Sequence, residues 1–565
     1  LTVRAKYSDG TDRDVTEQTM FISNNSIAAA ATPAGLITSG KPGEAFIMAR
    51  FDQITTGTQI LSIPKLPNYK FPSEPAGNYI DPLVYAKHKK VRITPSGMCD
   101  DNTFIRRIYL DVIGKLPERA AVEKFVADKS STKRAQLVDE LLGRPEFTKM
   151  WVMKWAELLQ IRTDNNRFQY KNAILYFEWL RSQFEKNRPM NEIVQEILGS
   201  KGGTFSNPAG NYYQIERDSK KLMENTVQIF MGMRIQCAQC HNHPFDRWTM
   251  NDYYSFANFF SQVGRKGGED NREIIIYNRG SGSVRHPVGN RDMPPKFLGG
   301  ETPDTAGKDR RELLAKWLAS DDNPFFAKNL ANIVWGHFMG MGIVEPVDDV
   351  RISNPPSNPE LLEELGQRFS KSGYNFKQLV RDICNSRTYQ RTVQSNDSNR
   401  EDTRNFAKAS IRRVRAEVLL DIISQVTNTK NKFRGLPNGA SAVEIVDGRT
   451  STYFLTTFGR ATRDTVCSCE VALEPNLSQA LHLLNGSTVN SKCIQGGVVA
   501  KALAAKKTPS EIIDDLYMRC LARKPFAAEK EKLMAFVGEE GRSDADVLND
   551  LFWAVLNSKE FIFNH

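Results

Sequence analysis

The chain has 565 residues, of which 40% are hydrophobic and 25% are charged, and this is an ordinary composition for a globular protein. It is too long for one hydrophobic core and should divide into roughly three or four domains. No apolar run approaches the ~18 residues that a membrane span requires, so no transmembrane segment is predicted. The net charge of +10 would suit an anionic partner, but basic and acidic residues are interspersed along the chain, which argues against nucleic-acid binding.

Residues 1–63 are predicted to form a small β-sandwich. Residues 1–7 alternate apolar and polar side chains, a turn signal follows at residues 9–10, and strand-like runs occupy residues 34–37 and 45–51. The order of these segments resembles a bacterial immunoglobulin-like group 2 domain that is entered one strand late. A further N-terminal piece is therefore expected before Leu1.

Residues 64–82 contain five prolines and are predicted to be a linker. Beyond the linker, apolar residues recur at every third or fourth position, which is typical of α-helices. The exception is a long loop at residues 263–305, where one strand-like run stands at residues 274–277 and where function is expected. The predicted fold is multidomain: a small immunoglobulin-like β-sandwich precedes a large, mainly α-helical body with one irregular loop and short-strand insertion.

Residues 237–241 read Cys-Ala-Gln-Cys-His. The spacing of Cys237 and Cys240 suits thioether bonds to the two vinyl groups of one porphyrin, and His241 would be the proximal iron ligand. The motif therefore predicts one covalent haem c. A zinc or iron site that His243 and a remote ligand would complete is an alternative, and a structural disulfide is another.

A helix is predicted directly after this motif, over residues 250–260. Thr249 and Asp252 have the spacing of a capping box at its start. One side of this helix is aromatic, which is consistent either with core packing or with a hydrophobic wall against a porphyrin.

The chain also resembles a known pair of modules. Residues 236–248, which include the Cys-x-x-Cys-His motif, resemble the signature of the planctomycete cytochrome C-type domain, and residues 106–117 and 286–300 resemble its opening and its close. A further set of segments resembles the planctomycete-specific C-terminal domain, among them residues 323–327, 332–338, 347–349, 412–417, 457–460 and 477–486. The resemblance implies c-type haem but no reaction, and it places the two modules at residues 83–305 and 306–565.

A sixth iron ligand or the ligands of a second metal ion would come from elsewhere in the fold. His286 precedes a proline in the long loop, where an exposed ligand and a capping histidine are both consistent with the sequence. His337 and His482 lie on apolar helices and are expected to be satisfied core histidines. The candidates for these ligand positions are His243, His286, His337, His482, Cys467 and Cys469.

Two further pairs of residues could carry chemistry. Cys467 and Cys469 are expected to form a disulfide, because haem is attached outside the cytoplasm, where thiols oxidise; a soft-metal site is the alternative. Asp348 and Asp349 could be catalytic carboxylates, but capping or salt bridging is the simpler expectation.

These patterns predict an exported c-type cytochrome, in the periplasm or at the cell surface, that passes electrons to a redox partner protein. One alternative is a haem-dependent oxidoreductase that acts on a small molecule or carbohydrate, with a cleft between the helical modules that residues 263–305 gate. Another alternative is a non-haem surface protein that binds zinc or iron.

Overall fold

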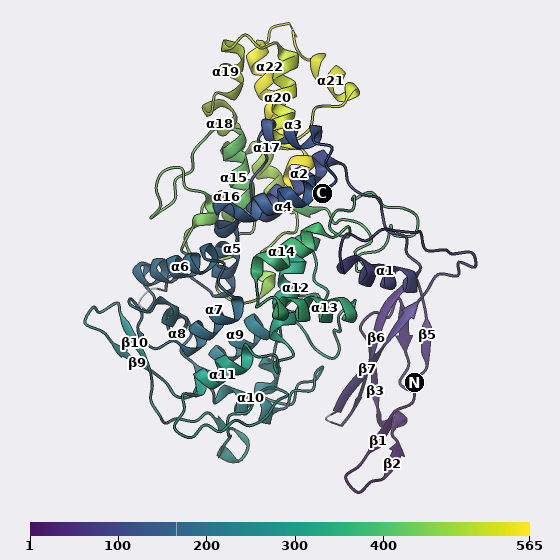
Figure 1. Cartoon of the computed structure of the whole chain (residues 1–565), viewed down its shortest axis with the longest axis vertical. Coiled ribbons are helices and arrows are strands. Elements are labelled where there is room, and N and C mark those ends of the chain that lie inside the picture. The colour runs from purple at the N-terminus through teal and green to yellow at the C-terminus, as the bar shows by residue number, and fades with distance from the viewer. Residues whose placement is uncertain (53, 165–166, 539) are drawn as a thin grey trace. The chain divides into compact units, whose positions relative to one another are not determined.

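The computed structural model describes residues 1–52, 54–164, 167–538 and 540–565, and it shows a small strand-rich N-terminal region followed by a mostly helical body (Figure 1). The chain divides into two compact units. Unit 1 consists of Leu1–Ser96, Arg188–Val380 and Ser395–Lys408, and unit 2 consists of Gly97–Asn187, Arg381–Gln394 and Ala409–His565. Among the described residues, no helix has the length and apolar character needed to cross a membrane.

The N-terminal region of unit 1 contains three antiparallel sheets, which confirms the prediction that this region is rich in strands. Their strands are β1 (Arg4–Lys6) with β2 (Asp12–Asp14), β3 (Met20–Ser23) with β6 (Gly43–Phe51) and β7 (Ile54–Ser62), and β4 (Ala29–Ala31) with β5 (Ile37–Ser39). A small apolar core of Ala28, Ala29, Ala45 and Ile47 joins the second and third sheets.

Helix α1 (Ile80–Val91) begins inside the predicted linker, so the linker is shorter than the sequence suggested. Pro82 lies in its first turn, where proline is tolerated because the backbone N–H that it lacks would have no partner in the helix. His88 on this helix is buried, and its Nε2 lies 2.5 Å from the carbonyl oxygen of Asn405.

The rest of unit 1 is a helical layer that holds the Cys-x-x-Cys-His segment. Helix α9 packs against α10 and α12, and α7 packs against α11. The helices are α7 (Met190–Gly199), α8 (Tyr212–Ile215), α9 (Ser219–Met231), α10 (Met250–Ala257), α11 (Arg310–Leu318), α12 (Phe326–Met339) and α13 (Pro359–Lys371), and α14 (Phe376–Asn385) continues into unit 2.

The predicted irregular loop at residues 263–305 contains more strand than expected. β9 (Val263–Gly267) and β10 (Ile274–Asn278) form a three-stranded sheet with β8 (Gly202–Gly203), and β11 (Arg285–His286) pairs with β12 (Arg291–Asp292). Because β9 is rich in glycine, its sequence predicted a loop and not a strand. A Cβ atom at Gly264 would lie 2.6 Å from the Tyr277 ring, so the close approach of β9 to β10 requires glycine there.

Unit 2 is helical around a core centred on α15 (Ala416–Val426). Its other helices are α2 (Asp101–Ile113), α3 (Arg119–Ala127), α4 (Lys133–Gly143), α5 (Pro145–Leu158), α6 (Tyr170–Glu185), α16 (Tyr453–Thr457), α17 (Leu477–Asn485), α18 (Ser487–Gln495), α19 (Val498–Ala504), α20 (Pro509–Leu521), α21 (Ala527–Met534), α22 (Asp544–Leu556) and α23 (Lys559–Ile562). A short ladder joins β13 (Arg412–Arg413) to β14 (Phe563–Asn564).

The two compact units do not follow the predicted boundary between residues 305 and 306. That boundary falls inside unit 1, while α2 to α6 of the first predicted module belong to unit 2 together with the C-terminal helices. Each compact unit is therefore built from segments of both predicted modules.

Candidate functional site

The Cys-x-x-Cys-His segment follows a sharp turn at the end of α9. Gly232 ends the helix at φ +69, and a Cβ atom there would lie 2.4 Å from Oδ1 of Asn329 on α12. Asn329 in turn donates from Nδ2 to the carbonyl oxygen of Ile229 at 2.8 Å. Only glycine fits a left-handed backbone with so close a neighbour, so this turn fixes where the chain leaves α9.

Cys237 and Cys240 are both free thiols and both exposed. Cys237 lies in a single turn of 3-10 helix over Gln236–Gln239, and Cys240 directly follows this turn and donates from its N–H to the Cys237 carbonyl oxygen at 3.5 Å. His241 is exposed, and its Nδ1 lies 2.8 Å from the carbonyl oxygen of Asn242. If Nδ1 donates to that carbonyl, Nε2 keeps a lone pair, so these residues fit two thioether bonds and one axial nitrogen ligand.

Helix α10 begins as predicted, because the structure confirms the capping box between Thr249 and Asp252. The helix ends at Ala257 rather than at residue 260. Its aromatic side chains Tyr253, Tyr254 and Phe256 are buried, and Phe256 lies 5.5 Å from the Phe259 ring, which favours core packing for this side of the helix.

Tyr254 differs from its aromatic neighbours because it reaches the motif. Its hydroxyl donates to the carbonyl oxygen of Gln239 at 3.0 Å, between the two cysteines. Gln236 is anchored from the other side, since its Nε2 donates to Oε1 of Gln228 on α9 at 3.3 Å. The turn that carries the thiols is therefore held by both α9 and α10.

His243 is buried and organises the turn after the motif. The Nδ1 atom of its ring accepts a hydrogen bond from the Phe245 backbone N–H at 3.2 Å, and the backbone N–H of His243 donates to the Trp248 carbonyl oxygen at 2.8 Å. Burial lowers the pKa of His243, although the nearby Asp246 carboxylate opposes that shift. Because Nδ1 already accepts this hydrogen bond, the contacts give the His243 imidazole a hydrogen-bonding role in the turn.

Asp348, one of the two candidate carboxylates, is a buried salt-bridge partner. It accepts hydrogen bonds from Nε2 of Gln228 at 2.6 Å and from Nη2 of Arg234 at 2.9 Å. Sequence reasoning did not identify Gln228 or Arg234, because no local signal links them to a residue more than 100 positions away.

Asp246 and Asp349 lie beside this pair. The Asp246 Oδ1 accepts from the Ile352 N–H at 3.3 Å, and Arg351 forms an ion pair with Asp349 at 3.2 Å. Burial raises the pKa of both carboxyl groups. The segment that contains Asp349 therefore packs directly against the residues that follow the Cys-x-x-Cys-His motif.

His286 on β11 is buried, with 3% of its surface exposed. Its Nδ1 lies 3.1 Å from the Val288 N–H group, and its ring centre lies 5.1 Å from that of Tyr254. Its Nε2 atom is buried and has no hydrogen-bond partner among the residues that the structure describes. The structure thus brings His286 close to the motif but places it in the interior, not on the exposed loop surface.

The other candidate ligands have different surroundings. His337 is half-buried on α12, with its ring 4.8 Å from the Phe338 ring, so it is less buried than a core histidine. His482 is the core histidine that was expected: its Nε2 lies 3.1 Å from Oγ1 of Thr488, and the Phe454 ring meets it edge to face with the ring centres 5.5 Å apart. In the described part of the chain, no group of three or more His, Cys, Asp and Glu side chains converges as metal ligands would.

Cys467 and Cys469 form a disulfide bond, as expected. Sulfur atoms in a disulfide are not thiolates, so the oxidised pair cannot provide the soft-metal site that was the alternative.

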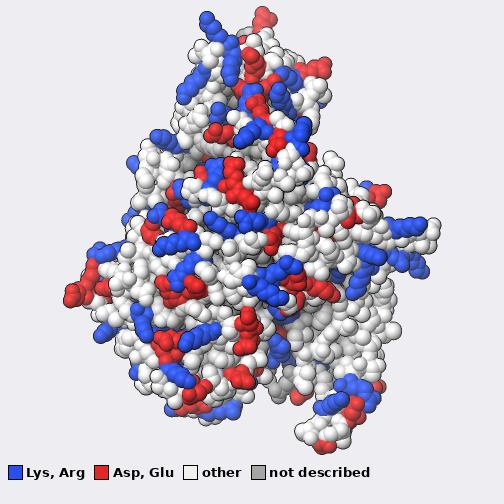
Figure 2. Space-filling view, viewed as in Figure 1, with Lys and Arg blue, Asp and Glu red and all other residues white. Residues whose placement is uncertain are grey.

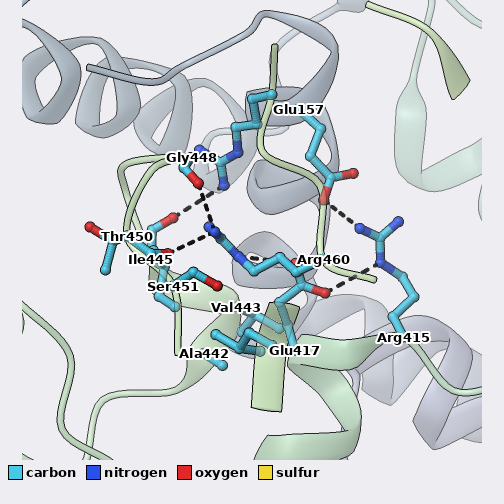
Figure 3. Close-up of polar contacts among 12 residues, drawn as sticks. Glu157, Arg415, Glu417, Ala442, Val443, Ile445, Gly448, Thr450, Ser451 and Arg460 are labelled. Atoms are coloured by element: carbon cyan, nitrogen blue, oxygen red, sulfur yellow. Dashed lines mark hydrogen bonds and ion pairs between the residues drawn. The ribbon is translucent and has the colours of Figure 1, made fainter. Parts of the chain in front are cut away.

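Motif residues of the second module form a buried ion network in unit 2 (Figure 3). Arg415 pairs with Glu157, and Arg460 pairs with Glu417 at 3.3 Å. Arg460 also donates to the Gly448 carbonyl oxygen at 3.0 Å. Because Arg415, Glu417 and Arg460 all take part in buried ion pairs, the network explains these motif residues as structural elements of unit 2.

Unit 1 also contains an open depression of about 520 Å³. It is lined by Lys201 and Gly202, by residues 275–278 of the predicted loop, and by Gly307, Asp309 and Glu312 of the second predicted module. Residues of both predicted modules and of the predicted loop therefore border this hollow.

Two family models match the chain. Residues 79–265 match PSCyt2, described as a protein of unknown function (DUF1549), and residues 310–537 match PSD1, described as a protein of unknown function (DUF1553). These matches support the architecture of a planctomycete cytochrome C-type module followed by its C-terminal module. No curated protein and no solved structure is significantly similar to the chain.

Proposed function

We propose that this chain is an exported c-type cytochrome that holds one haem c and exchanges electrons with a redox partner protein at the cell envelope. The observation that carries the proposal is the pair of exposed, free thiols of Cys237 and Cys240 on one turn, followed by the exposed imidazole of His241. The name of the matching family model, PSCyt2, agrees with a role like that of cytochrome c.

The residues around the motif would position the group. Cys237 and Cys240 would bind the two vinyl carbons, and His241 would supply Nε2 while the Asn242 carbonyl accepts from Nδ1 and fixes the ring. The bound haem would supply one-electron redox chemistry. The hydrogen bond from Tyr254 to Gln239 would keep the turn rigid while the iron changes its charge.

Export follows from the same chemistry, because thioether attachment takes place outside the cytoplasm. The strand-rich N-terminal region would then be an immunoglobulin-like spacer or adhesive arm at the cell envelope. On the face drawn in Figure 2, basic and acidic side chains are intermingled.

The proposal is tested by producing the full chain in cells equipped for c-type haem maturation. A pyridine haemochrome spectrum should show one haem per chain, and the haem should remain on the chain after denaturing electrophoresis. The Cys237→Ala/Cys240→Ala variant should lose this band. The Cys467→Ala/Cys469→Ala variant is the matched control, since it removes the other closely spaced cysteine pair and should keep the haem.

Two outcomes would contradict the proposal. One is a purified chain without a haemochrome spectrum, and the other is stoichiometric zinc or non-haem iron that disappears in the Cys237→Ala/Cys240→Ala variant. The second outcome would favour the metal-binding surface protein that the motif also allows.

A second candidate function is a haem-dependent oxidoreductase that acts on a small molecule or carbohydrate. The depression of about 520 Å³ in unit 1 favours it, because its lining combines polar side chains with the exposed ring of Tyr277. Saturable binding of oligosaccharides to the haem-loaded chain, lost in a Tyr277→Ala variant, would support this function.

A further inference from the structure

We propose that the disulfide between Cys467 and Cys469 is a thiol–disulfide exchange site that oxidises a pair of cysteine thiols in another protein. This inference goes beyond the proposed function and does not depend on haem at Cys237 and Cys240. It is carried by the exposure of the disulfide, by the hydrogen bond to one of its sulfur atoms and by an apolar hollow beside the segment that follows it.

The disulfide closes a very short loop. Only Ser468 separates the two cysteines. The stabilisation that a disulfide provides decreases with the length of the loop that it closes, so a loop with one intervening residue gives little of it. The backbone already closes the same turn, since the Glu470 N–H donates to the Cys467 carbonyl oxygen at 3.2 Å. Stabilisation of the fold is therefore a poor explanation for this bond.

The disulfide is also accessible. Cys469 is exposed and Cys467 is half-buried, whereas the free cysteines of unit 2 are all buried. Exchange begins when a thiolate attacks one of the two sulfur atoms, so the attacking thiol must reach the bond. Exposed disulfides are accordingly more often labile or catalytic than buried ones.

The two sulfur atoms are not equivalent. The Cys469 N–H donates to the Sγ atom of Cys467 at 3.3 Å. A hydrogen bond to sulfur stabilises the thiolate, and a more stable thiolate leaves faster. Attack on Sγ of Cys469, the more exposed cysteine, therefore releases the better leaving group.

Two carboxylates flank the cysteines in the sequence, and both are engaged by other groups. Oε1 of Glu470 accepts from the Asp464 N–H at 2.7 Å, and the Asp464 carboxylate forms an ion pair with Arg162 at 2.8 Å. These contacts reduce the negative potential that opposes the approach of a thiolate.

An apolar hollow of about 260 Å³ in unit 2 lies beside the segment that follows the disulfide. Arg413 lines this hollow and donates to the carbonyl oxygens of Ala472 and Leu473, which come shortly after Cys469 in the chain. The hollow therefore fits an apolar side chain next to the reacting cysteine of the substrate. Its apolar lining includes Phe458, Leu483, Leu484 and Ile562.

The reaction consists of two exchange steps. A substrate thiolate attacks Sγ of Cys469, so that a mixed disulfide forms, the bond to Cys467 breaks and Cys467 leaves as a thiolate. The second substrate thiol then loses its proton and attacks the substrate sulfur of the mixed disulfide, which releases Cys469 as a thiolate. The substrate dithiol has lost two electrons and two protons, and Cys467 and Cys469 have gained the electrons and take up protons.

The test uses the full chain with its disulfide intact, after iodoacetamide has capped the exposed free thiols. A synthetic peptide with one cysteine between two leucines is added, and new thiols are then labelled with N-ethylmaleimide and located by mass spectrometry. The peptide should be found on Cys469 and the label on Cys467. A peptide with serines in place of the leucines should react about tenfold more slowly, because it does not fill the hollow.

Two substitutions on α17 test the hollow itself. Leu484→Ser removes a lining residue that is 50% exposed and should slow the reaction of the leucine peptide but not that of the serine peptide. Leu481→Ser is the matched control, because Leu481 is 49% exposed on the same helix but is not part of the lining, and both rates should stay unchanged.

A peptide with two cysteines tests the complete reaction. The wild-type chain should oxidise one such peptide per chain, and the Cys467→Ala/Cys469→Ala variant should oxidise none. The urea midpoint of this variant should stay close to that of the wild type, which separates the loss of exchange from a loss of folding.

The inference is overturned if no mixed disulfide forms, if the peptide is found mainly on Cys467, or if the leucine and serine peptides react at the same rate. It is also overturned if the Cys467→Ala/Cys469→Ala variant has a much lower urea midpoint, because the disulfide would then be structural. Haem is not needed for any of these measurements, so each of these results leaves the proposed function standing.

Discussion

Removal of the Glu417 side chain should destabilise unit 2 more than removal of the acidic side chain of any exposed ion pair. Its side chain is 1% exposed, and it pairs with Arg460, which is 2% exposed, at 3.3 Å and with Arg415 at 3.8 Å. Without the carboxylate, two guanidinium groups lose a counter-charge in the interior (Figure 3). Breaking a buried pair from one side costs about 3–5 kcal/mol, so the Glu417→Ala variant should lose about that much free energy of unfolding.

The control is Glu123→Ala in the same unit, where Glu123 pairs with Arg119 at 2.7 Å but is 50% exposed. An exposed ion pair contributes about 0.2–1 kcal/mol to stability, so the free energy of unfolding of this variant should be close to that of the wild type. Both are measured by urea denaturation, with hydrogen exchange in α15 as a local readout that does not depend on two-state unfolding. If Glu417→Ala and Glu123→Ala differ by less than about 1 kcal/mol, Glu417 does not have the stabilising role inferred from its burial.

Two further predictions concern titration and thiol reactivity. Burial raises the pKa of Asp421 to about 6, above its ordinary value of 3.8, so the stability that its protonated form contributes is lost as the pH rises through about 6. In the wild-type protein, this titration should lower the free energy of unfolding by about 3 kcal/mol between about pH 4 and pH 7, and Asp421→Asn should abolish that decrease, as measured by urea denaturation at each pH. The same dependence of unfolding free energy on pH in the variant and the wild type would contradict this prediction. In chain produced without haem, Cys237 and Cys240 should be the two fast-reacting thiols by mass spectrometry after brief alkylation, because the other free cysteines are buried. Fast labelling of more than two sites would show that the buried cysteines are accessible.

Features set by local chemistry could be predicted from the sequence. The capping box of Thr249 and Asp252 lies within four consecutive residues, and the start of α10 follows from it directly. The strands near the N-terminus were also visible, because alternation of apolar and polar residues is a short-range pattern. The disulfide between Cys467 and Cys469 was expected from the oxidising compartment in which haem is attached, since their spacing alone also allowed a soft-metal site.

Features set by long-range contacts could not be predicted. Strand β9 contains two glycines, and one of them, Gly264, lies against the Tyr277 ring, which comes close only after folding. The burial of His286 against Tyr254 is likewise a property of packing: the sequence showed a histidine before a proline but not the tyrosine beside it. The ion pair between Arg234 and Asp348 joins residues of different predicted modules, which no local pattern connects.

The position of that ion pair changes how the second module should be understood. The Val350 N–H donates to the Gly232 carbonyl oxygen at 2.7 Å, before the cysteines, and the Ile352 N–H donates to Asp246 at 3.3 Å, after them. A segment of the second predicted module therefore supports both flanks of the Cys-x-x-Cys-His turn. Without it, the carboxylate of Asp246 and the backbone of Gly232 would lose these hydrogen bonds, and a buried polar group without a partner costs about 1–3 kcal/mol. The C-terminal module is thus a structural part of the candidate haem site, which explains why unit 1 combines residues from both matched regions.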